Sequence, residues 1–410
     1  MSLSVDKSFL KSGHTPTLFA AFLYFDISFM IWVLLGPLGV QVAAILSLDP
    51  AQKGLMVAVP VLAGALLRIP FGLATDQFGA RAVAIVTQAM LVVGLVVIWL
   101  VGIPSYEAVL SLGVVLGIGG ASFAIALPLV SRWYPPAHQG TAMGIAGAGN
   151  IGTVFTALFA PELAKLLGVP NVFGICAVIM AVTLLVFTLL AKNPPTYMYP
   201  KPFASYFKVL SLPDTWCFMG FYGVTFGGFV GLAAALTLYI HGVYGLSPVH
   251  AGFATAACAF VGGSIRPFGG YLADRLGGIK VLGALYLLAA AALVVLSFAI
   301  PSFWLALAVF LVVMAAFGMG DGAVFQLIPL RFGQEIGTVT GFVGMAGGVG
   351  GFYLASSLGF SKQLTGSYQM GFLIFAALAL LAFAGLTAVK GKWRADLAPA
   401  DPAIAGSIRI

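Results

Sequence analysis

The sequence contains very little charge. Nineteen basic and twelve acidic residues make up 8% of the 410 residues, whereas a soluble domain carries about 25%. So few charges cannot cover the water-facing surface of a soluble protein of this length. Intrinsic disorder is excluded as well, because it requires low hydrophobicity and 61% of this chain is hydrophobic. The composition is that of a protein that crosses a membrane several times.

Cysteine and histidine are also scarce. The three cysteines, Cys176, Cys217 and Cys258, lie in apolar segments at spacings that fit neither a disulfide framework nor a metal site. The four histidines are scattered near expected helix ends and form no ligand cluster. We therefore expect no metal and no cofactor. No catalytic constellation and no soluble catalytic domain is visible, so we do not expect an enzyme.

Long apolar runs take the place of alternating polar and apolar residues, which excludes an outer-membrane barrel. Each run is about 20 residues long, the length that a helix needs to cross the hydrocarbon core of a bilayer. The expected fold class is therefore an all-α membrane protein with twelve transmembrane helices. The predicted spans are 17–46, 54–75, 82–103, 107–130, 141–163, 171–191, 214–240, 250–273, 280–300, 302–329, 337–360 and 370–389.

The longest internal polar segment, 192–213, lies at the midpoint of the chain and is rich in proline and lysine. It is predicted to be a cytoplasmic linker between two pseudo-symmetric six-helix halves. These halves are residues 1–191 and 214–410, and the second ends in a short cytoplasmic tail.

The basic residues predict the orientation of the chain. If the N-terminus is cytoplasmic, Lys53, Lys165 and Lys362 lie outside, Arg68 and Arg266 lie within spans, and the remaining fourteen lie on the cytoplasmic side. This is the distribution of the positive-inside rule. It explains the net charge of +7 without a nucleic-acid partner. We expect a multi-pass protein in the lipid bilayer of the cytoplasmic membrane, with both termini cytoplasmic. The fourteen are Lys7, Lys11, Arg81, Arg132, Lys192, Lys201, Lys208, Arg275, Lys280, Arg331, Lys390, Lys392, Arg394 and Arg409.

Two motifs occur once in each predicted half. The first recurs after 198 residues: Arg68, Gly72, Asp76 and Gly79 correspond to Arg266, Gly270, Asp274 and Gly277. The second begins with Gly-Thr before spans five and eleven and continues into the glycine-rich segments 144–152 and 341–351. Repeated halves are characteristic of secondary transporters, which bind their substrate near the membrane midplane between the halves.

Arg68 and Arg266 are the two charges expected deep in the membrane. Arg68 lies eight residues before Asp76, about 12 Å along a helix, and the repeat places Arg266 at the same depth. An arginine there costs about 2.5–3.5 kcal/mol and cannot lose its proton. Either each arginine pairs permanently with a carboxylate, for which Asp26 and Asp321 are the candidates, or both form a pocket for a small anion. The guanidinium fork suits a planar oxyanion.

The glycine-rich segments allow two interpretations. Small residues permit close helix packing, but these glycines are denser than packing alone requires. Asn150 also adds an amide in the middle of a span, and an amide can donate a hydrogen bond to an anion.

The Gly-x-x-x-Asp-x-x-Gly-x-Arg pattern at 72–81, repeated at 270–280, resembles the loop signature of the major facilitator superfamily. The resemblance covers essentially the whole chain and implies the major facilitator fold. It also implies that Asp76, Arg81 and Asp274 latch the cytoplasmic faces of the helices, a gating role, and do not bind substrate. The alternative is that they are ordinary loop charges.

Segments 146–152 and 344–351 resemble the paired nitrate signatures of the nitrate/nitrite porter family within that superfamily, and the two arginines complete the match. This resemblance implies that the anion lies between the arginines beside the glycine segments, with Asn150 as a hydrogen-bond donor and aromatic rings on its faces. Without the resemblance, core packing would be the more natural interpretation of these rings in a chain with 33 phenylalanines. The implied substrate-binding residues are Arg68, Arg266, Asn150, Phe123, Tyr222, Phe226, Gly147, Gly149 and Gly347.

The first and tenth spans resemble the proton-symporter branch of the family more than its nitrate/nitrite exchanger branch. Asp321 departs from the asparagine expected in span ten. It is either a proton-coupling residue or the static partner of an arginine, and Asp26 is the second proton-coupling candidate.

We therefore expect a monomeric secondary transporter that takes up nitrate or nitrite by alternating access, with protons co-transported. Nitrate/nitrite exchange and the transport of another small planar anion, such as formate or oxalate, are the alternatives.

Overall fold

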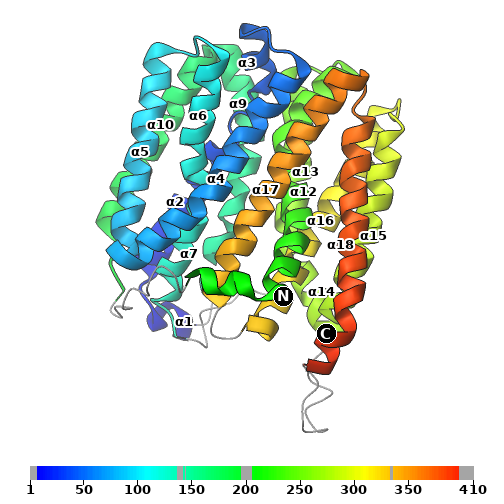
Figure 1. Ribbon diagram of the computed structural model, residues 1–410. Coiled ribbons are helices and arrows are strands. Elements are labelled where there is room, and N and C mark those ends of the chain that lie inside the picture. Colours follow the sequence, from blue (N-terminus) through cyan, green and yellow to red (C-terminus); the bar gives the residue numbers. More distant parts are fainter. Residues whose placement is uncertain (1–6, 136–141, 144, 195–205, 333–335, 397–410) are drawn as a thin grey trace.

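The computed structural model describes residues 7–135, 142–143, 145–194, 206–332 and 336–396, and within these ranges the chain is helical and forms no strand. The helices run side by side, with the blue-to-teal N-terminal helices next to the green-to-red C-terminal helices (Figure 1). The N-terminal group is α1 (Lys7–Ser12), α2 (Thr15–Trp32), α3 (Gly39–Ile45), α4 (Pro50–Phe78), α5 (Ala80–Val101), α6 (Tyr106–Gly120), α7 (Phe123–Ser131), the 3-10 helix η1 (Ala148–Ile151), α9 (Gly152–Leu167) and α10 (Val169–Leu190).

The C-terminal group begins within the second half of the predicted linker, 192–213. It consists of the 3-10 helix η2 (Lys208–Ser211), α12 (Pro213–Tyr244), α13 (Pro248–Ser264), α14 (Arg266–Leu276), α15 (Gly278–Ser297), α16 (Phe303–Phe332), α17 (Ile336–Thr365) and α18 (Gln369–Asp396).

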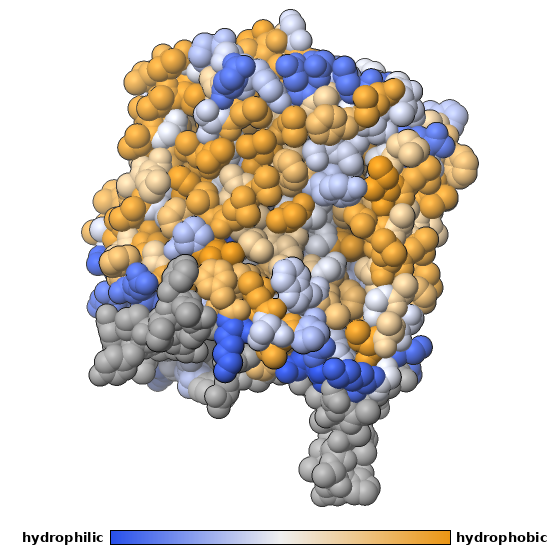
Figure 2. Space-filling view, in the orientation of Figure 1, coloured by the Kyte–Doolittle hydropathy of each residue, from blue (hydrophilic) through white to orange (hydrophobic). Residues whose placement is uncertain are grey.

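Within the described residues, eleven helical segments are long and apolar enough to cross a membrane. Figure 2 shows the corresponding surface, with a broad hydrophobic band between two hydrophilic rims. The fifth predicted span, 141–163, corresponds to η1 and α9, and α9 has only 16 residues. Residues 141 and 144 of that span lie outside the described residues, as do Gly140 and much of the predicted linker. The prediction of an all-α, multi-pass membrane protein is confirmed.

The first predicted span, 17–46, is not a single helix. Helix α2 ends at Trp32, residues 33–38 form turns, and α3 begins at Gly39. The interruption contains Gly36 and Pro37, and proline has no N–H to continue a helical hydrogen-bond ladder. Gly36 also meets the C-terminal group, because a Cβ atom there would lie 2.8 Å from the carbonyl oxygen of Ala234.

Two further spans are interrupted at the centre of the bundle. The fourth span changes from α6 to α7 at Ala121 and Ser122, directly after two glycines, which are weak helix formers. The eighth changes from α13 to α14 at Ile265, two residues before Pro267. Discontinuous helices expose backbone polar groups to a binding site in many transporters, and the two interruptions lie beside Arg68 and Arg266.

Helix α17 packs between α4 and α12 through its glycines. A Cβ atom on Gly348 would lie 2.5 Å from that of Ala65 on α4, and one on Gly350 would lie 1.9 Å from the carbonyl oxygen of Gly223 on α12. Contacts this close require glycine. For these two residues the packing interpretation of the glycine-rich segment is therefore confirmed.

The two groups of helices also meet at the end of the bundle that lies opposite α1 and the end of α18 (Figure 1). There a Cβ on Gly54 of α4 would lie 2.8 Å from the Cα of Gly359 on α17, and one on Gly252 of α13 would lie 2.5 Å from the Ala157 carbonyl of α9. A Cβ on Gly147 or Gly341, nearer the other end, would meet nothing within 4 Å. The bundle is thus more tightly closed at the end away from the termini.

Candidate functional site

Arg68 lies on α4 and is 3% exposed. Its Nε donates to the carbonyl oxygen of Gly120 at 3.1 Å, and its Nη1 donates to that of Gly344 on α17. The Gly120 carbonyl is turned toward Arg68 where α6 ends. No carboxylate forms an ion pair with Arg68 among the described residues. This guanidinium is therefore held by backbone dipoles and keeps its full positive charge.

Aromatic rings surround the Arg68 guanidinium. Its Cζ lies 5.4 Å from the ring centroids of Phe123 and Phe226 and 5.6 Å from that of Trp32. Cation–π contacts of this kind are worth about 2 kcal/mol when desolvated. The rings also keep water away from the cation, which strengthens its attraction for an anion.

Arg266 begins α14, beside the interruption at Ile265, and it does have a carboxylate partner. Its Nη2 forms an ion pair with Oδ2 of Asp321 on α16, whose side chain is 2% exposed. The Nε of Arg266 and Oδ1 of Asp321 are both buried without a hydrogen-bond partner in the described structure. The Thr225 hydroxyl interacts with the Asp321 carboxylate. The pairing of an arginine with a carboxylate therefore holds for Arg266 and not for Arg68.

Phe226 brings the two arginines together. The Cζ of Arg266 lies 5.2 Å from the Phe226 centroid, on which Arg68 also packs. Tyr222 stacks on Phe226 at 5.0 Å with an interplanar angle of 6° and interacts electrostatically with both arginines. A Cβ on Gly347 would lie 2.7 Å from the Tyr222 ring and 2.8 Å from the Phe226 ring. The structure thus gathers Arg68, Arg266, Phe123, Tyr222, Phe226 and Gly347 at one place.

Asn150 lies elsewhere in the described structure. It is 7% exposed and belongs to η1, which packs against α2 and α13. None of its described contacts reaches either arginine. A Cβ on Gly149 would lie 2.6 Å from the Phe25 ring on α2, and that ring in turn lies 5.8 Å from Phe123. This segment is therefore connected to the arginine site through Phe25.

Asp26 is the neighbour of Phe25 on α2. The residue is 8% exposed, and Oδ1 has no hydrogen-bond partner in the described structure. The carboxylate interacts with the backbone of Gly152, and a Cβ on Gly152 would collide with the Asp26 carbonyl at 2.1 Å. Asp26 forms no ion pair with an arginine among the described residues. Of the two carboxylates considered from the sequence, only Asp321 lies at the site.

The three predicted gating residues have different surroundings. Asp76 forms an ion pair with Arg132 at the end of α7 and accepts a hydrogen bond from the Tyr206 hydroxyl at 2.6 Å. Arg81 donates to the carbonyl oxygens of Thr188 at 2.9 Å and of Ala191 at 2.7 Å, and thereby caps the end of α10. Asp274 is exposed, and no partner is described for it.

Several groups that the structure places in contact with the arginines were not predicted from the sequence. Trp32 packs on Arg68, Phe229 lies 5.4 Å from Arg266, and the carbonyls of Gly120 and Gly344 accept from Arg68. In the sequence these aromatic residues could not be distinguished from the many other aromatic residues of the chain. The carbonyls carry no side-chain signal at all, and only the adjacent glycines, where helices break or touch, point to them.

A second polar cluster, also missed, lies where α12 begins and α16 ends. Asp214 forms an ion pair with Arg331, whose Nε donates to the carboxylate at 3.0 Å. The same carboxylate accepts a hydrogen bond from Trp393 Nε1 at 2.9 Å. It ties α18 to α12 and α16 near the termini.

Helices that break beside two arginines, one buried and one partly buried, in a bundle with repeated motifs define a secondary transporter. The chain matches the family model of the Major Facilitator Superfamily over residues 17–355 and belongs to this superfamily. It superposes on the solved D-xylose-proton symporter with a TM-score of 0.75 and 13% identity, covering 91% of this chain and 97% of that one. This likeness concerns the fold alone.

Two relatives identify the branch of the superfamily. Over 365 residues the chain is 36% identical to the "Probable nitrate/nitrite transporter NarK2" of Mycobacterium tuberculosis, covering 87% of this chain and 91% of the relative. Over 355 residues it is 33% identical to the "Nitrite extrusion protein" of Bacillus subtilis, covering 87% and 89%. The chain belongs to the nitrate/nitrite transporter family of the Major Facilitator Superfamily.

Proposed function

We propose that the protein takes up nitrate or nitrite across the cytoplasmic membrane by alternating access. The observation that carries this proposal is Arg68, a buried cation that has no ion-pair partner among the described residues and shares the Phe226 ring with Arg266. An anion between the two guanidinium groups supplies the missing negative charge. The names of both relatives refer to nitrate or nitrite.

The shape of the site favours a planar anion. Each guanidinium fork donates two parallel hydrogen bonds to a flat oxyanion, and the rings of Phe123, Tyr222 and Phe226 cover its faces. Flat rings leave no room for the out-of-plane oxygens of phosphate or sulfate, which are therefore rejected. The Tyr222 hydroxyl is a further donor. Formate and oxalate share the planar shape and are the competing substrates to be tested.

The remaining predicted residues belong to the proposed substrate path. Gly147 lies beside open space, and Gly149 allows η1 to approach Phe25. We assign the Asn150 amide to the anion-bound state, in which a shift of η1 along α2 brings it toward the arginines. Gly347 leaves room for the rings of Tyr222 and Phe226.

Asp321 provides a mechanism for coupling to protons. While Asp321 is ionised, its carboxylate forms an ion pair with the Arg266 guanidinium and competes with the anion for that group. Protonation of Asp321 removes the negative charge and releases Arg266 for the anion, so that one proton and one anion bind together. Asp26, a buried carboxylate without an arginine partner, is the second proton-coupling candidate.

Nitrate/nitrite exchange is the second candidate function, favoured by the name of the Bacillus relative, a nitrite extrusion protein. In exchange, Asp321 stays ionised throughout, and the anion contacts Arg266 without displacing the carboxylate. The two functions differ in whether a pH gradient drives accumulation.

Alternating access requires the two halves, which we place at 1–191 and 214–410 with a linker at 192–213, to rock about the arginines. With both termini cytoplasmic, the closed end at Gly54 and Gly359 faces outward. Asp76 and Arg81 lie at the opposite end and, with Asp274, form the proposed cytoplasmic gate. The protein acts as a monomer in the lipid bilayer, and each molecule contains a complete site.

The test is uptake into proteoliposomes with an imposed pH gradient, measured with and without nitrite inside. Proton symport predicts nitrate accumulation that follows the gradient and needs no internal nitrite. Uptake that requires internal nitrite and ignores the gradient establishes exchange in its place. If neither nitrate nor nitrite is transported while formate or oxalate is, the assigned substrate is wrong.

A further inference from the structure

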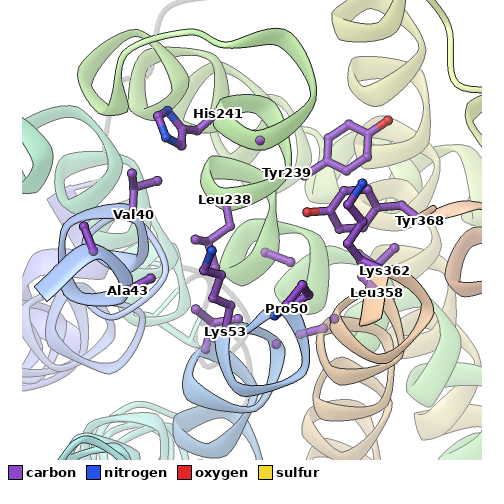
Figure 3. Close-up of a pocket in the computed structure, with 17 residues that line it drawn as sticks. Val40, Ala43, Pro50, Lys53, Leu238, Tyr239, His241, Leu358, Lys362 and Tyr368 are labelled. Atoms are coloured by element: carbon purple, nitrogen blue, oxygen red, sulfur yellow. The ribbon is translucent and has the colours of Figure 1, made fainter. Parts of the chain in front are cut away.

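A cavity of about 360 Å³ lies between the two groups of helices at the end of the bundle opposite the termini. Figure 3 shows it between α4 and α17 with α12 above, and with side chains from the α3 segment on its other side. Its lining includes Gly54 and Gly359, which close this end of the bundle. The cavity is therefore the vestibule that opens toward the arginine site when the halves separate there.

The vestibule is positively charged. Its lining contains Lys53 and Lys362 and no acidic residue. Neither lysine has an ion-pair partner among the described residues. The nearest carboxylate along α4 is that of Asp49, which accepts the Gln52 N–H at 2.8 Å and caps its own helix. Two ammonium groups that line one cavity, with no carboxylate paired to either among the described residues, attract a negatively charged occupant.

The polar groups of this vestibule are held in place. Lys362 Nζ donates to the Gly366 carbonyl at 2.7 Å and lies 5.5 Å from the Tyr368 ring. The Tyr368 hydroxyl has no hydrogen bond in the described structure, and Figure 3 shows it directed toward the side of Lys53. Burial raises the pKa of Tyr368, so its hydroxyl stays a donor at neutral pH. His241 Nδ1 donates to the Leu246 carbonyl at 2.7 Å, which fixes the imidazole in the wall.

The vestibule is separate from the central site. Lys53 precedes Arg68 by fifteen residues on α4, about 22 Å along the helix, so one small anion cannot contact both side chains. An anion held by the lysines is therefore bound at a second place. The volume is also large for a small anion alone, since one water occupies about 30 Å³. It admits an anion with part of its hydration shell.

We propose that Lys53, Lys362 and Tyr368 form an entry site that captures a small monovalent anion from the solution outside before the halves open. The proposal rests on the proposed anion transport and on the proposed orientation. It assigns a second anion site to the same path, in which the ion remains partly hydrated. The arginine site then removes the remaining water.

Binding at this site is tested in the wild-type protein without transport. The protein, reconstituted in phosphatidylcholine vesicles, is treated from outside with an amine-acylating reagent in sodium nitrate or in sodium gluconate of equal ionic strength. Nitrate should slow modification of Lys53 and Lys362 at least about threefold and leave the exposed Lys165 unaffected, because bound anion shields the amines. Equal rates in both salts for all three lysines overturn the proposal, whatever the uptake assay gives.

The role in transport is tested with the double variant Lys53→Gln/Lys362→Gln. Rim charges act on association more than on later steps, so the KM for external nitrate should rise about 3- to 10-fold in low salt while kcat is unchanged. The effect should shrink in high salt, and Lys53→Arg/Lys362→Arg should restore the wild-type KM. Lys165→Gln is the matched control. An unchanged KM in an active double variant excludes the role of these lysines in capturing the anion. A wild-type protein that transports neither nitrate nor nitrite would instead contradict the proposed function.

Discussion

Asp321→Asn tests the central feature of the mechanism, the competition between a carboxylate and the anion for Arg266. In the structure Asp321 binds Arg266 through an ion pair in a site where its side chain is 2% exposed. A hydrogen bond to a charged group contributes about 1.5–3 kcal/mol, and the incoming anion must replace it. Asparagine keeps the shape of the side chain and removes the charge. The variant therefore imitates the protonated state.

The expected result is a KM for nitrate about 10- to 100-fold lower at neutral pH, because about 1.4 kcal/mol corresponds to a factor of ten. In the wild type, the KM should rise with pH, since ionised Asp321 holds Arg266. In the variant this dependence on pH should vanish. A pH gradient should no longer drive accumulation, while exchange of labelled for unlabelled nitrate continues.

The assay is the initial rate of labelled nitrate exchange in proteoliposomes between pH 5.5 and 8.5, together with gradient-driven accumulation. Glu162→Gln, which removes a carboxylate far from the arginines, is the control for general effects of charge. Size-exclusion chromatography checks folding, because Arg266 loses its partner in the variant. If gradient-driven accumulation persists in Asp321→Asn, the reasoning is refuted and Asp26 becomes the carrier to test.

Three other predictions concern the guanidinium of Arg68, the glycine beside the Tyr222 and Phe226 rings, and the stabilising Asp214 cluster. Arg68→Lys keeps the positive charge, but lysine cannot donate to the carbonyls of both Gly120 and Gly344, so kcat/KM for nitrate should fall at least about 30-fold. An activity near that of the wild type would show that Arg68 does not bind the substrate. Gly347→Ala places a Cβ under 3 Å from the rings of Tyr222 and Phe226 and should abolish uptake although the protein folds. Gly220→Ala is the control, because Gly220 has open space around it and its substitution should preserve uptake. Equal uptake rates for the two variants would contradict the proposed role of Gly347. Asp214→Asn should lower the free energy of unfolding by about 1–3 kcal/mol, which is measured as a lower apparent melting temperature in detergent. The control is Asp274→Asn, because Asp274 has no described partner and its substitution should leave the melting temperature unchanged. Equal melting temperatures for both variants would argue against a stabilising role of the Asp214 cluster.

The pairing of only one arginine has a functional consequence. Two uncompensated guanidinium groups around one ring would repel each other and leave the empty carrier with two buried charges, each of which is costly. Asp321 neutralises Arg266, while backbone carbonyls and rings stabilise Arg68. The empty site thus keeps a net positive charge. One monovalent anion balances it in exchange, where Asp321 stays ionised, whereas in symport the proton on Asp321 and the anion together leave it unchanged. This asymmetry could not be inferred from the repeat, in which the two arginines occupy equivalent positions.

The sequence determined that the chain crosses a membrane several times, where most of its long apolar segments lie, and which motifs repeat, because these depend on composition and on spacing along the chain. It also identified both arginines of the site, since a charge within an apolar span is visible in one dimension. It did not locate the helix interruptions at Ala121 and Ile265. Helix ends inside a membrane depend on which backbone groups find partners in neighbouring helices, and those partners are distant in the sequence.

Only the tertiary structure decided which groups meet. It placed Asp321 on Arg266 and left Asp26 with the backbone of Gly152, although both are single carboxylates in apolar spans. It divided the glycines between helix packing at Gly348 and Gly350 and the rings at Gly347. It also brought Lys53 and Lys362, which the sequence only counted as charges on the outer side, into one cavity. Contacts of this kind depend on distances between helices, and a pattern along one chain does not contain them.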